Sequence, residues 1–444
     1  MPRPVTAGDE RRGTFLLYDL LLYLAGVVLA PWAAWQAVRD PGFRRALPGR
    51  LGLGLRRRDD RPLLLHGVSV GEVKALLPLV QLLRRERPEV PVLVSASTPT
   101  GLAEARRSLP DVEVLPYPLD LRGATRRFLD RVRPRGVVLA ELEIWPNFLR
   151  ACQRCGVPVA IVNGRITEAS IRGYRRVQRW LPRFEWIRLY AVQDEVYRDR
   201  FLELGVPEDR LLVVGNLKYD RDPPAEPAAA WRAWTSCSTA PWVVLASTHE
   251  DEEERLVAAW NRRDGPHRGA VLVVAPRHPR RADGLAPRLE GLHVGRVLRR
   301  SAIGADDGPG PGDLVLLDVF GELESAYAVS QCAFVGGSLV PHGGQNVLEA
   351  AAAGIPMTTG PHVENFANEV ELLERTGSLR RVPDADSVLE SFVTWLEDPA
   401  AAAAAGAAGR QALLSSRGAT RHTLEALDRR GFLAPHPHSQ RSSA

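Results

Sequence analysis

The chain has 444 residues, a length that favours two domains over one. Hydrophobic residues make up 45% of it and charged residues 25%, a composition typical of a globular protein with a sizeable core. The net charge of +5 suits an anionic ligand or membrane face, but no basic run is interleaved with aromatic residues, which argues against nucleic acid as a partner. Four cysteines are too few for a disulfide framework and indicate a reduced, cytosol-facing compartment.

Residues 1–50 are predicted to form a membrane anchor followed by a basic linker. No residue from Leu20 to Val38 is charged, and a span of the bilayer needs about 20 apolar residues. Arginines crowd the C-terminal side of this stretch, which by the positive-inside tendency leaves the main body in the cytoplasm. A cleaved signal peptide is the alternative, and a helix that spans the membrane and one that lies in its interface both remain open.

Short apolar runs alternate with amphipathic segments along the rest of the chain. The runs predicted as strands are residues 62–67, 90–97, 135–141, 157–164, 188–193 and 210–215 in the first half, and 241–247, 269–276, 312–318, 332–337 and 354–360 in the second. This alternation predicts an α/β fold in which parallel sheets are covered by helices on both faces.

Residues 220–234, rich in proline and alanine, interrupt the alternation and are predicted to be a linker. The interruption predicts two doubly wound, Rossmann-like domains at residues 51–222 and 223–434, with an unstructured tail at 435–444. Ligands of such sheets bind at the carboxyl ends of the strands, so the candidate residues are those that follow each apolar run.

The candidates of the first half follow three predicted strands. Ser69 and Glu72 fit the S-x-x-E pattern of a helix capping box, so Glu72 is either a cap or a carboxylate aimed at the ligand edge of the sheet. Glu141 and Glu143 follow another strand, an expensive place for carboxylates unless they are paired or used. Lys218 follows a third strand, where a plain surface lysine is the simpler interpretation.

The second half carries a glycine-rich segment, VGGSLVPHGGQNVLEAAAAGIP, at residues 335–356. Its glycines allow a ligand to approach the backbone closely, and a helix that begins near Asn346 favours a phosphate. Glu349, one turn further on, is placed to accept hydrogen bonds from ribose hydroxyls. The alternative is a plain glycine turn with an asparagine cap. The segment does not have the Walker pattern of a P-loop.

Two other strand ends of the second half are candidates for anion binding. Arg277 and His278 suit a phosphate or a carboxylate, unless they belong to a solvated basic loop. Ser247 or Thr248 is predicted to cap the acidic helix that follows, so a ligand role for either of them, or for His249, needs further support.

No metal or other cofactor is expected from the sequence. Two D-x-D sequences, at 220–222 and 384–386, imitate the signature of metal-using sugar transferases. Both fall in predicted loops or in the linker, where chance composition explains them.

Ten segments in register resemble the 3-deoxy-D-manno-octulosonic acid (Kdo) transferases of lipopolysaccharide synthesis. The segments are HGVSVGEV, SASTPTG, LPYPLDL, ELEIWPNFL, NGRITEASIRGY, VGNLKYD, LASTHEDEE, APRHPRR, FGELESAYAVSQCAFVGGSLVPHGGQNVLEAAAAGIP and GPHVENF. They extend from His66 to Phe366, and the N-terminal apolar stretch looks like that family's anchor. The resemblance implies a GT-B glycosyltransferase, with two Rossmann-like domains facing a cleft, at the cytoplasmic face of the cell inner membrane.

The resemblance also implies substrates and site residues. The donor would be CMP-Kdo, held mainly by the C-terminal half, and the acceptor a lipid A precursor. Glu72 matches the general base, and Glu141 and Lys218 match residues that stabilise the transition state. The residues expected to bind the donor are Ser247, Thr248, His249, Pro276, Arg277, Phe320, Gly321, Glu322, Asn346, Val347, Leu348 and Glu349. Gln345 and Val347 depart from the family, which usually has His and Pro there.

The chemistry of sugar transfer agrees with these roles. The acceptor hydroxyl loses its proton as it attacks, so a carboxylate must lie within hydrogen-bond reach. Cationic side chains and helix N-termini can stabilise the leaving phosphate without a metal. A helix N-terminus also stabilises ionised Glu72, which is expected to make it a weaker base. The rival interpretations are a GT-B enzyme with another nucleotide sugar, a UDP-sugar 2-epimerase, which would not need the anchor, and a non-catalytic membrane-tethered relative.

Overall fold

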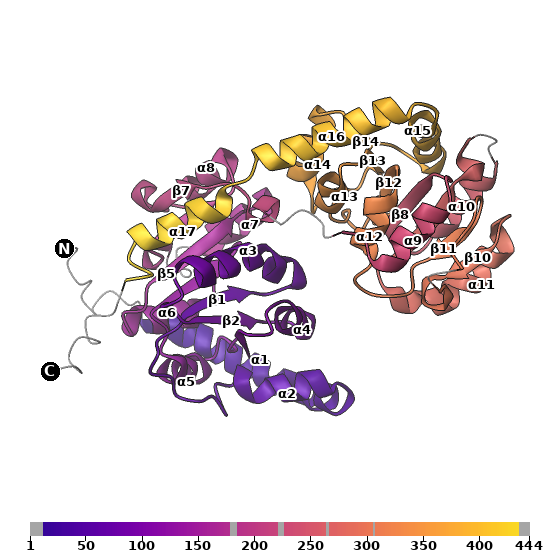
Figure 1. The fold of residues 1–444 in the computed structure, drawn as a ribbon. Coiled ribbons are helices and arrows are strands. Elements are labelled where there is room, and N and C mark those ends of the chain that lie inside the picture. Colours follow the sequence, from indigo (N-terminus) through magenta and orange to yellow (C-terminus); the bar gives the residue numbers. More distant parts are fainter. Residues whose placement is uncertain (1–11, 178–183, 221–225, 263–265, 305–306, 435–444) are drawn as a thin grey trace. The chain divides into compact units, whose positions relative to one another are not determined.

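The computed structural model describes residues 12–177, 184–220, 226–262, 266–304 and 307–434. Packing divides the chain into two compact units (Figure 1). Among the described residues, those up to 220 and those from 417 onward form the first unit, and those from 226 to 416 form the second. The predicted tail at 435–444 lies outside the described residues.

The first unit is built on a parallel sheet. Its strands, within the described part of the chain, are β1 (Leu63–Gly67), β2 (Val92–Ala96), β3 (Glu113–Pro116), β4 (Gly136–Ala140), β5 (Val159–Gly164), β6 (Leu189–Val192) and β7 (Leu211–Val213). Their order across the sheet is β3-β2-β1-β4-β5-β6-β7. The chain runs outward from β1 to β3 and then crosses back to β4, so β1 and β4 are neighbours where the strand order reverses.

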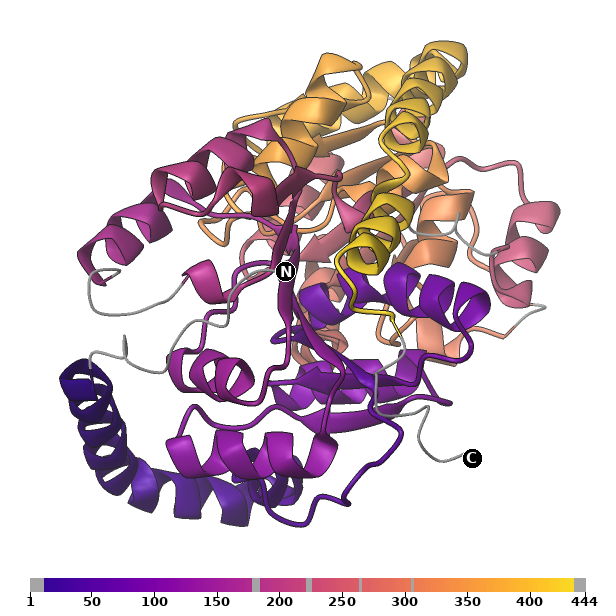
Figure 2. The ribbon, with the colours of Figure 1, turned by 90° about the vertical axis from the view of Figure 1, so that its left-hand side faces the viewer.

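Helices cover both faces of this sheet (Figures 1 and 2). They are α1 (Arg12–Arg39), α2 (Pro41–Arg50), α3 (Val70–Glu86), α4 (Pro99–Ser108), α5 (Arg122–Val132), α6 (Pro146–Arg154), α7 (Glu168–Val177), α8 (Glu195–Glu203) and α17 (Ala419–Arg429). Leu63 and Leu65 pack with α3, α4 and α17, whereas Leu64 packs with α5 and α6 on the opposite face. A strand buried on both faces needs an apolar side chain at every position, which explains the unbroken leucine run.

The second unit repeats this architecture. Its described strands are β8 (Trp242–Thr248), β9 (Val271–Pro276), β10 (Val297–Arg299), β11 (Leu314–Leu316), β12 (Cys332–Val335), β13 (Met357–Thr359) and β14 (Leu379–Arg381), in the order β10-β11-β9-β8-β12-β13-β14. Its helices are α9 (Ala229–Cys237), α10 (Glu252–Arg262), α11 (Ala282–Leu292), α12 (Leu323–Val329), α13 (Leu348–Ala353), α14 (Ala367–Arg375), α15 (Ala385–Glu397) and α16 (Pro399–Ser415). Here the strand order reverses between β8 and β12. The predicted α/β fold with two doubly wound parallel sheets is confirmed.

Three strands were not predicted, and all three lie at sheet edges. They are β3 in the first unit and β10 and β14 in the second. Each of these strands is only three or four residues long. Some of their side chains are exposed or half-buried, such as those of Glu113, Arg299 and Arg381. An edge strand is covered less completely than a central one, so its sequence does not show the apolar run on which the prediction depends.

Two predicted boundaries are corrected by the packing. Residues 229–234 of the predicted linker belong to α9, because Trp231 and Trp234 are fully buried beside Trp242 of β8. The predicted second domain at 223–434 includes α17, but this helix packs on α3 and β6 and belongs to the first unit.

The N-terminal segment forms two helices. One stretch, Thr14–Arg39 within α1, is long and apolar enough to cross a membrane by length and composition. The part predicted as a linker contains α2, which packs on β3 and α4. A Cβ atom on Gly49 of α2 would lie 2.5 Å from Cγ of Pro116, so this helix lies very close to the end of β3.

Candidate active site

The first candidate site lies where the strand order of the first sheet reverses. Glu72 stands in the first turn of α3, directly after β1, and Glu141 directly follows β4. Lys218 comes from the short 3₁₀ helix η3 (Leu217–Asp220), which follows β7. Because β1 and β4 are parallel neighbours, their carboxyl ends lie side by side. Glu72 and Glu141, which follow these two strands, therefore lie at the same end of the sheet.

Both oxygens of the Glu72 carboxylate are held at the N-terminus of α3. Oε2 accepts a hydrogen bond of 2.8 Å from the amide of Val68, and Oε1 accepts one of 2.9 Å from the hydroxyl of Ser69. Ser69 caps the helix by accepting from the amide of Glu72, at 3.4 Å. The predicted capping box is therefore present in a shifted form, in which Glu72 reaches the amide one residue before the cap.

Glu72 nevertheless has a raised pKa. Burial is the main cause, and the nearby charge of Glu141 adds to it, while the hydrogen bonds from Val68 and Ser69 and the charge of Lys218 oppose it. The expectation that the helix N-terminus would make Glu72 a weaker base is wrong, because desolvation outweighs the donors. The carboxylate is thus both positioned and basic.

Glu141 adopts a conformation that a non-glycine residue rarely takes, with φ of 57°. Its side chain is held from two sides, by Nε of Arg165 at 2.8 Å and by Nζ of Lys218 at 3.2 Å. Strained backbone persists where surrounding contacts determine it, and it clusters at functional sites. Lys218 is therefore not a plain surface lysine, because its ammonium group is paired with Glu141.

Glu143 is a third carboxylate of this group. It accepts a hydrogen bond of 3.0 Å from the indole of Trp145. Burial, followed by the charge of Glu72, raises the pKa of Glu143 to about 7. The sequence marked Glu143 as a costly strand-end carboxylate without assigning it to the site. It did not single out Arg165, whose signal was its place directly after the last residue of β5.

The second candidate site lies where the strand order of the second sheet reverses. Ser247 and Thr248 end β8, and Ser247 has a left-handed φ of 52°. The predicted caps are wrong, because α10 begins only at Glu252. The hydroxyl of Thr248 instead donates to Oε1 of Glu253, at 2.9 Å. His249 stacks on His342, with ring centroids 4.2 Å apart, so the loops after β8 and β12 meet here.

A buried carboxylate that the sequence did not reveal organises these loops. Glu252 is fully buried and accepts four backbone hydrogen bonds of 2.7–2.9 Å, from His249, Gly337, Ser338 and Leu339. The amide of Gly337 is thereby already bound within the protein, so this glycine serves the loop rather than a ligand.

Asn346 forms a turn at the start of α13, but the helix begins at Leu348 rather than at Asn346. Its Oδ1 accepts from the amide of Leu348 at 3.1 Å, and its Nδ2 donates to Oε1 of Glu349 at 3.2 Å. The side chains of Val347 and Leu348 are buried, which leaves their backbone as the part that can reach a ligand.

The remaining donor candidates differ in exposure. Pro276 is buried at the end of β9, whereas Arg277 is exposed, and its guanidinium has no hydrogen bond or ion pair within the part of the chain that the structure describes. Phe320 is 69% exposed and precedes Gly321, whose φ is 89°.

The carboxylate of Glu322, in contrast, is already held within the protein. It accepts hydrogen bonds from the indole of Trp231 at 2.6 Å and from Nε of Arg300 at 2.6 Å.

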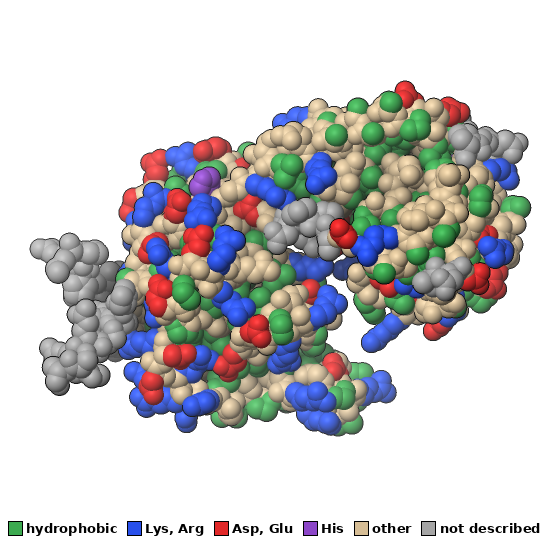
Figure 3. Space-filling view, viewed as in Figure 1, with side chains coloured by type: hydrophobic (Ala, Val, Ile, Leu, Met, Phe, Trp, Pro, Cys, Tyr) green, Lys and Arg blue, Asp and Glu red, His purple; other side chains and the backbone are tan. Residues whose placement is uncertain are grey.

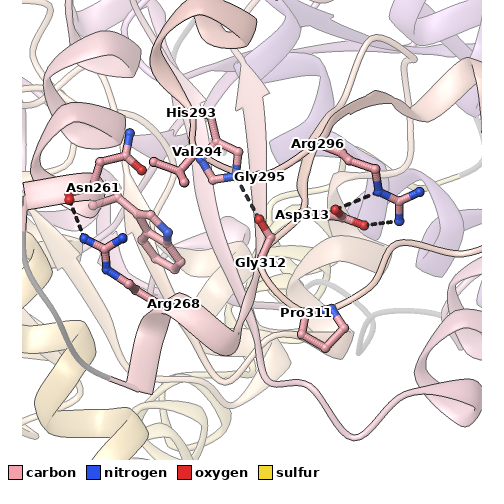
Figure 4. Close-up of a pocket in the computed structure, with 10 residues that line it drawn as sticks. Asn261, Arg268, His293, Val294, Gly295, Arg296, Pro311, Gly312 and Asp313 are labelled. Carbon is pink, nitrogen blue, oxygen red and sulfur yellow. Dashed lines mark hydrogen bonds and ion pairs between the residues drawn. The ribbon is translucent and has the colours of Figure 1, made fainter.

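One further hollow of the second unit, of about 510 Å³, lies at the amino-terminal ends of the strands, opposite to the candidate site (Figure 4). It is lined by loops that precede β9, β10 and β11, and its polar groups bind one another, as Arg296 does with Asp313. No group of three or more His, Cys, Asp or Glu side chains is placed to hold a metal ion among the described residues.

The fold has known counterparts. UDP-GlcNAc 2-epimerase from Neisseria meningitidis, solved with UDP-GlcNAc bound, is 13% identical, with a TM-score of 0.56 over 83% of this chain and 100% of that chain. At this identity the likeness concerns the fold, which is GT-B. With the relatives below, it defines the chain as a glycosyltransferase of this architecture.

Sequence relatives give the family. A family model described as 3-deoxy-D-manno-octulosonic-acid transferase (kdotransferase) matches residues 45–221. The 3-deoxy-D-manno-octulosonic acid transferase of Bordetella pertussis is 35% identical over 92% of this chain and 97% of its own length, and that of Haemophilus influenzae is 31% identical over the same shares. The chain belongs to the 3-deoxy-D-manno-octulosonic acid transferase family.

Proposed function

We propose that the chain transfers Kdo from CMP-Kdo to a hydroxyl of a lipid A precursor, with inversion, at the cytoplasmic face of the inner membrane. Family membership supports Kdo as the transferred sugar. The apolar stretch of α1 supports a membrane-bound acceptor. The observation that carries the mechanism is the carboxylate of Glu72, fixed by two donors and made more basic by burial.

In the proposed reaction, the acceptor oxygen forms a bond to the anomeric carbon of Kdo as the bond from that carbon to the CMP phosphate breaks. The acceptor proton passes to Glu72, and CMP leaves with the bonding electron pair. A single displacement of this kind inverts the anomeric centre. A positioned carboxylate contributes about 10²–10⁴-fold to such a proton transfer. Glu141 and Lys218 stabilise the charge that develops nearby.

The donor residues of the second unit have different proposed roles. Arg277 offers a guanidinium to the phosphate, and Asn346 and Glu349 face the nucleoside from the start of α13. Ser247, Thr248 and His249 line the same edge after β8, and Pro276 ends the neighbouring strand. Phe320 is exposed enough to lie against a base, and Gly321 with Glu322 shapes the turn beside it. In this proposal no metal is required.

The test is product formation, followed by mass spectrometry. CMP-Kdo is first made by coupled synthesis, and the tetra-acylated lipid A precursor and excess EDTA are then added before the transferase. The expected result is a gain of one or more Kdo masses that EDTA does not reduce. Replacing the donor by UDP-sugars is expected to give no product. Transfer from a UDP-sugar, or none from CMP-Kdo, would refute the assigned donor, and a loss with EDTA would refute the metal-free mechanism.

A further inference from the structure

Helix α1 is attached to the folded body of the first unit at both ends. Near its start Phe15 is buried and stacks on Trp186, with ring centroids 6.1 Å apart. At its other end α1 continues into α2, where Trp32 meets Phe43 at 6.0 Å and α2 packs on β3 and α4. A helix that crosses a bilayer has its ends on opposite sides of it, whereas both ends of α1 contact the same body.

Two polar side chains within the apolar stretch bind the body rather than solvent. The hydroxyl of Tyr18 donates to Oδ2 of Asp120 at 2.9 Å, and Oδ1 of Asp19 accepts from Nδ2 of Asn147 at 2.7 Å. Asp19 is only 7% exposed, and Arg150 lies 3.9 Å from its second oxygen. A carboxylate is expensive in hydrocarbon. These contacts give Asp19 a partner only if this end of α1 stays on the protein.

The length of α1 alone does not exclude a span. No residue from 20 to 39 is buried, and residues 23–32 are all exposed. Twenty helical residues extend about 30 Å, the thickness of a hydrocarbon core. A span would, however, place the two ends of this stretch on opposite faces of the bilayer, so the contacts of Phe15, Tyr18 and Asp19 with the body would have to break.

The free face of α1 has the chemistry of a membrane interface. Leu17, Leu21, Val28, Leu29 and Trp32 are each more than half exposed. Arg39 lies over the ring of Trp35 at 4.3 Å, and α2 continues with exposed Arg44 and Arg45. Basic side chains gather over this part of the unit (Figure 3). Apolar and aromatic side chains bordered by arginines match the acyl-chain boundary of a leaflet with anionic headgroups.

We propose that α1 lies in the plane of one leaflet of an anionic bilayer and does not cross it, with the contacts of Tyr18 and Asp19 holding it to the body. This inference rests on the proposed function, which places the acceptor in that membrane. Asp120 also accepts from the amides of Asn147 and Phe148, at the start of α6. The segment just before α6 carries Glu141 and Glu143, so these contacts join the lipid surface to the candidate catalytic segment.

The test is side-specific labelling of the full-length chain. Leu16→Cys, Val28→Cys and Val38→Cys are made one at a time with the exposed thiols removed by Cys155→Ser and Cys237→Ser. Each variant is added to preformed vesicles of phosphatidylcholine and phosphatidylglycerol and treated with a membrane-impermeant maleimide. We expect Leu16→Cys and Val38→Cys to react equally in intact vesicles. A fluorophore on Val28→Cys should be quenched more by shallow than by deep nitroxide lipids.

Three results would overturn the in-plane arrangement. Reaction of Leu16→Cys only after the vesicles are permeabilised, or stronger quenching of Val28→Cys by deep nitroxides, would show a spanning helix. A dimeric chain that does not bind vesicles would assign the apolar face to a second copy. Kdo transfer to a detergent-dispersed acceptor, measured on the same variants, separates the two proposals: activity with a spanning helix refutes only the in-plane anchor, and inactivity with in-plane labelling refutes only the function.

Discussion

The three carboxylates at the end of β1 and β4 have different surroundings although they lie in one site. Glu141 faces two cations, Glu72 faces two neutral donors, and Glu143 faces a single indole. Their charges oppose one another, so the group with the fewest donors is the one whose pKa rises to about 7. Near neutral pH the site therefore holds a carboxyl group that is only partly ionised.

This difference predicts a pH-dependent effect of Glu143→Gln on stability. The pKa of Glu143 is raised from 4.5 to about 7 in the folded protein, so the folded state binds its proton more tightly than the unfolded chain does. Stability from this group is fully present below pH 4.5 and is lost as the pH rises through about 7. Glu143→Gln should raise Tm by about 2–4 °C at pH 8 and change it little at pH 5, as measured by scanning calorimetry.

Exposed Glu89 provides the matched control. Glu89→Gln removes the same charge without a buried site, and its effect on Tm should be small at both pH values. An equal change in Tm for Glu143→Gln at pH 5 and pH 8 would contradict the assigned cause.

At the scale of elements, the sequence predicts where a helix is capped after a strand, but it does not predict every hydrogen-bond partner of the capping side chains. The S-x-x-E pattern predicted a cap at α3, and the structure has one, but the amide that Glu72 binds depends on how β1 enters the turn. The acidic start of α10 looked like dipole complementarity. Glu252 instead binds a loop 85 residues away in the sequence, a contact with no local signal.

The four amides that Glu252 accepts predict a strong effect of Glu252→Gln. An amide group cannot accept where the second carboxylate oxygen did, so two buried N–H groups lose their partner, at about 1–3 kcal/mol each. We expect the variant to lose about 2–6 kcal/mol of unfolding free energy in the second unit and to bind CMP more weakly. Calorimetric melting with and without CMP measures both.

Asp251→Asn is the control for this substitution. Asp251 is the preceding residue, has a φ of 71° that asparagine also tolerates, and its side chain is 73% exposed. It should leave melting and CMP binding unchanged. A Glu252→Gln variant as stable as the wild type would show that the loop does not depend on this carboxylate.

At the scale of the molecule, the alternation of apolar runs was enough to predict both sheets, because central strands buried on two faces must be apolar throughout. Membership of α17 in the first unit could not be predicted in this way. Its Leu424 and Leu427 join the core beside α3 only because the chain returns from the second unit after Ser416. Such a return leaves no local pattern, so the sequence placed α17 with the domain that precedes it.

The same limit applies to the sites. Glu72, Glu141 and Lys218 were found because each follows a strand, and the structure brings Glu141 into contact with Lys218. Arg165 was missed as a site residue because an arginine after a turn is common on any surface. Its role depends on pairing with Glu141 across neighbouring strands.

The proposed role of Glu72 as the proton acceptor is tested by the single-turnover rate of Kdo transfer by Glu72→Gln against the wild type, at saturating CMP-Kdo and lipid A precursor. Glutamine can accept from Val68 and donate to Ser69, so Tm should not fall and will report an intact fold. We expect the rate to fall by about 10²–10⁴-fold because the proton acceptor is lost. A rate within about threefold of the wild type would contradict it and leave Glu72 as the cap of α3.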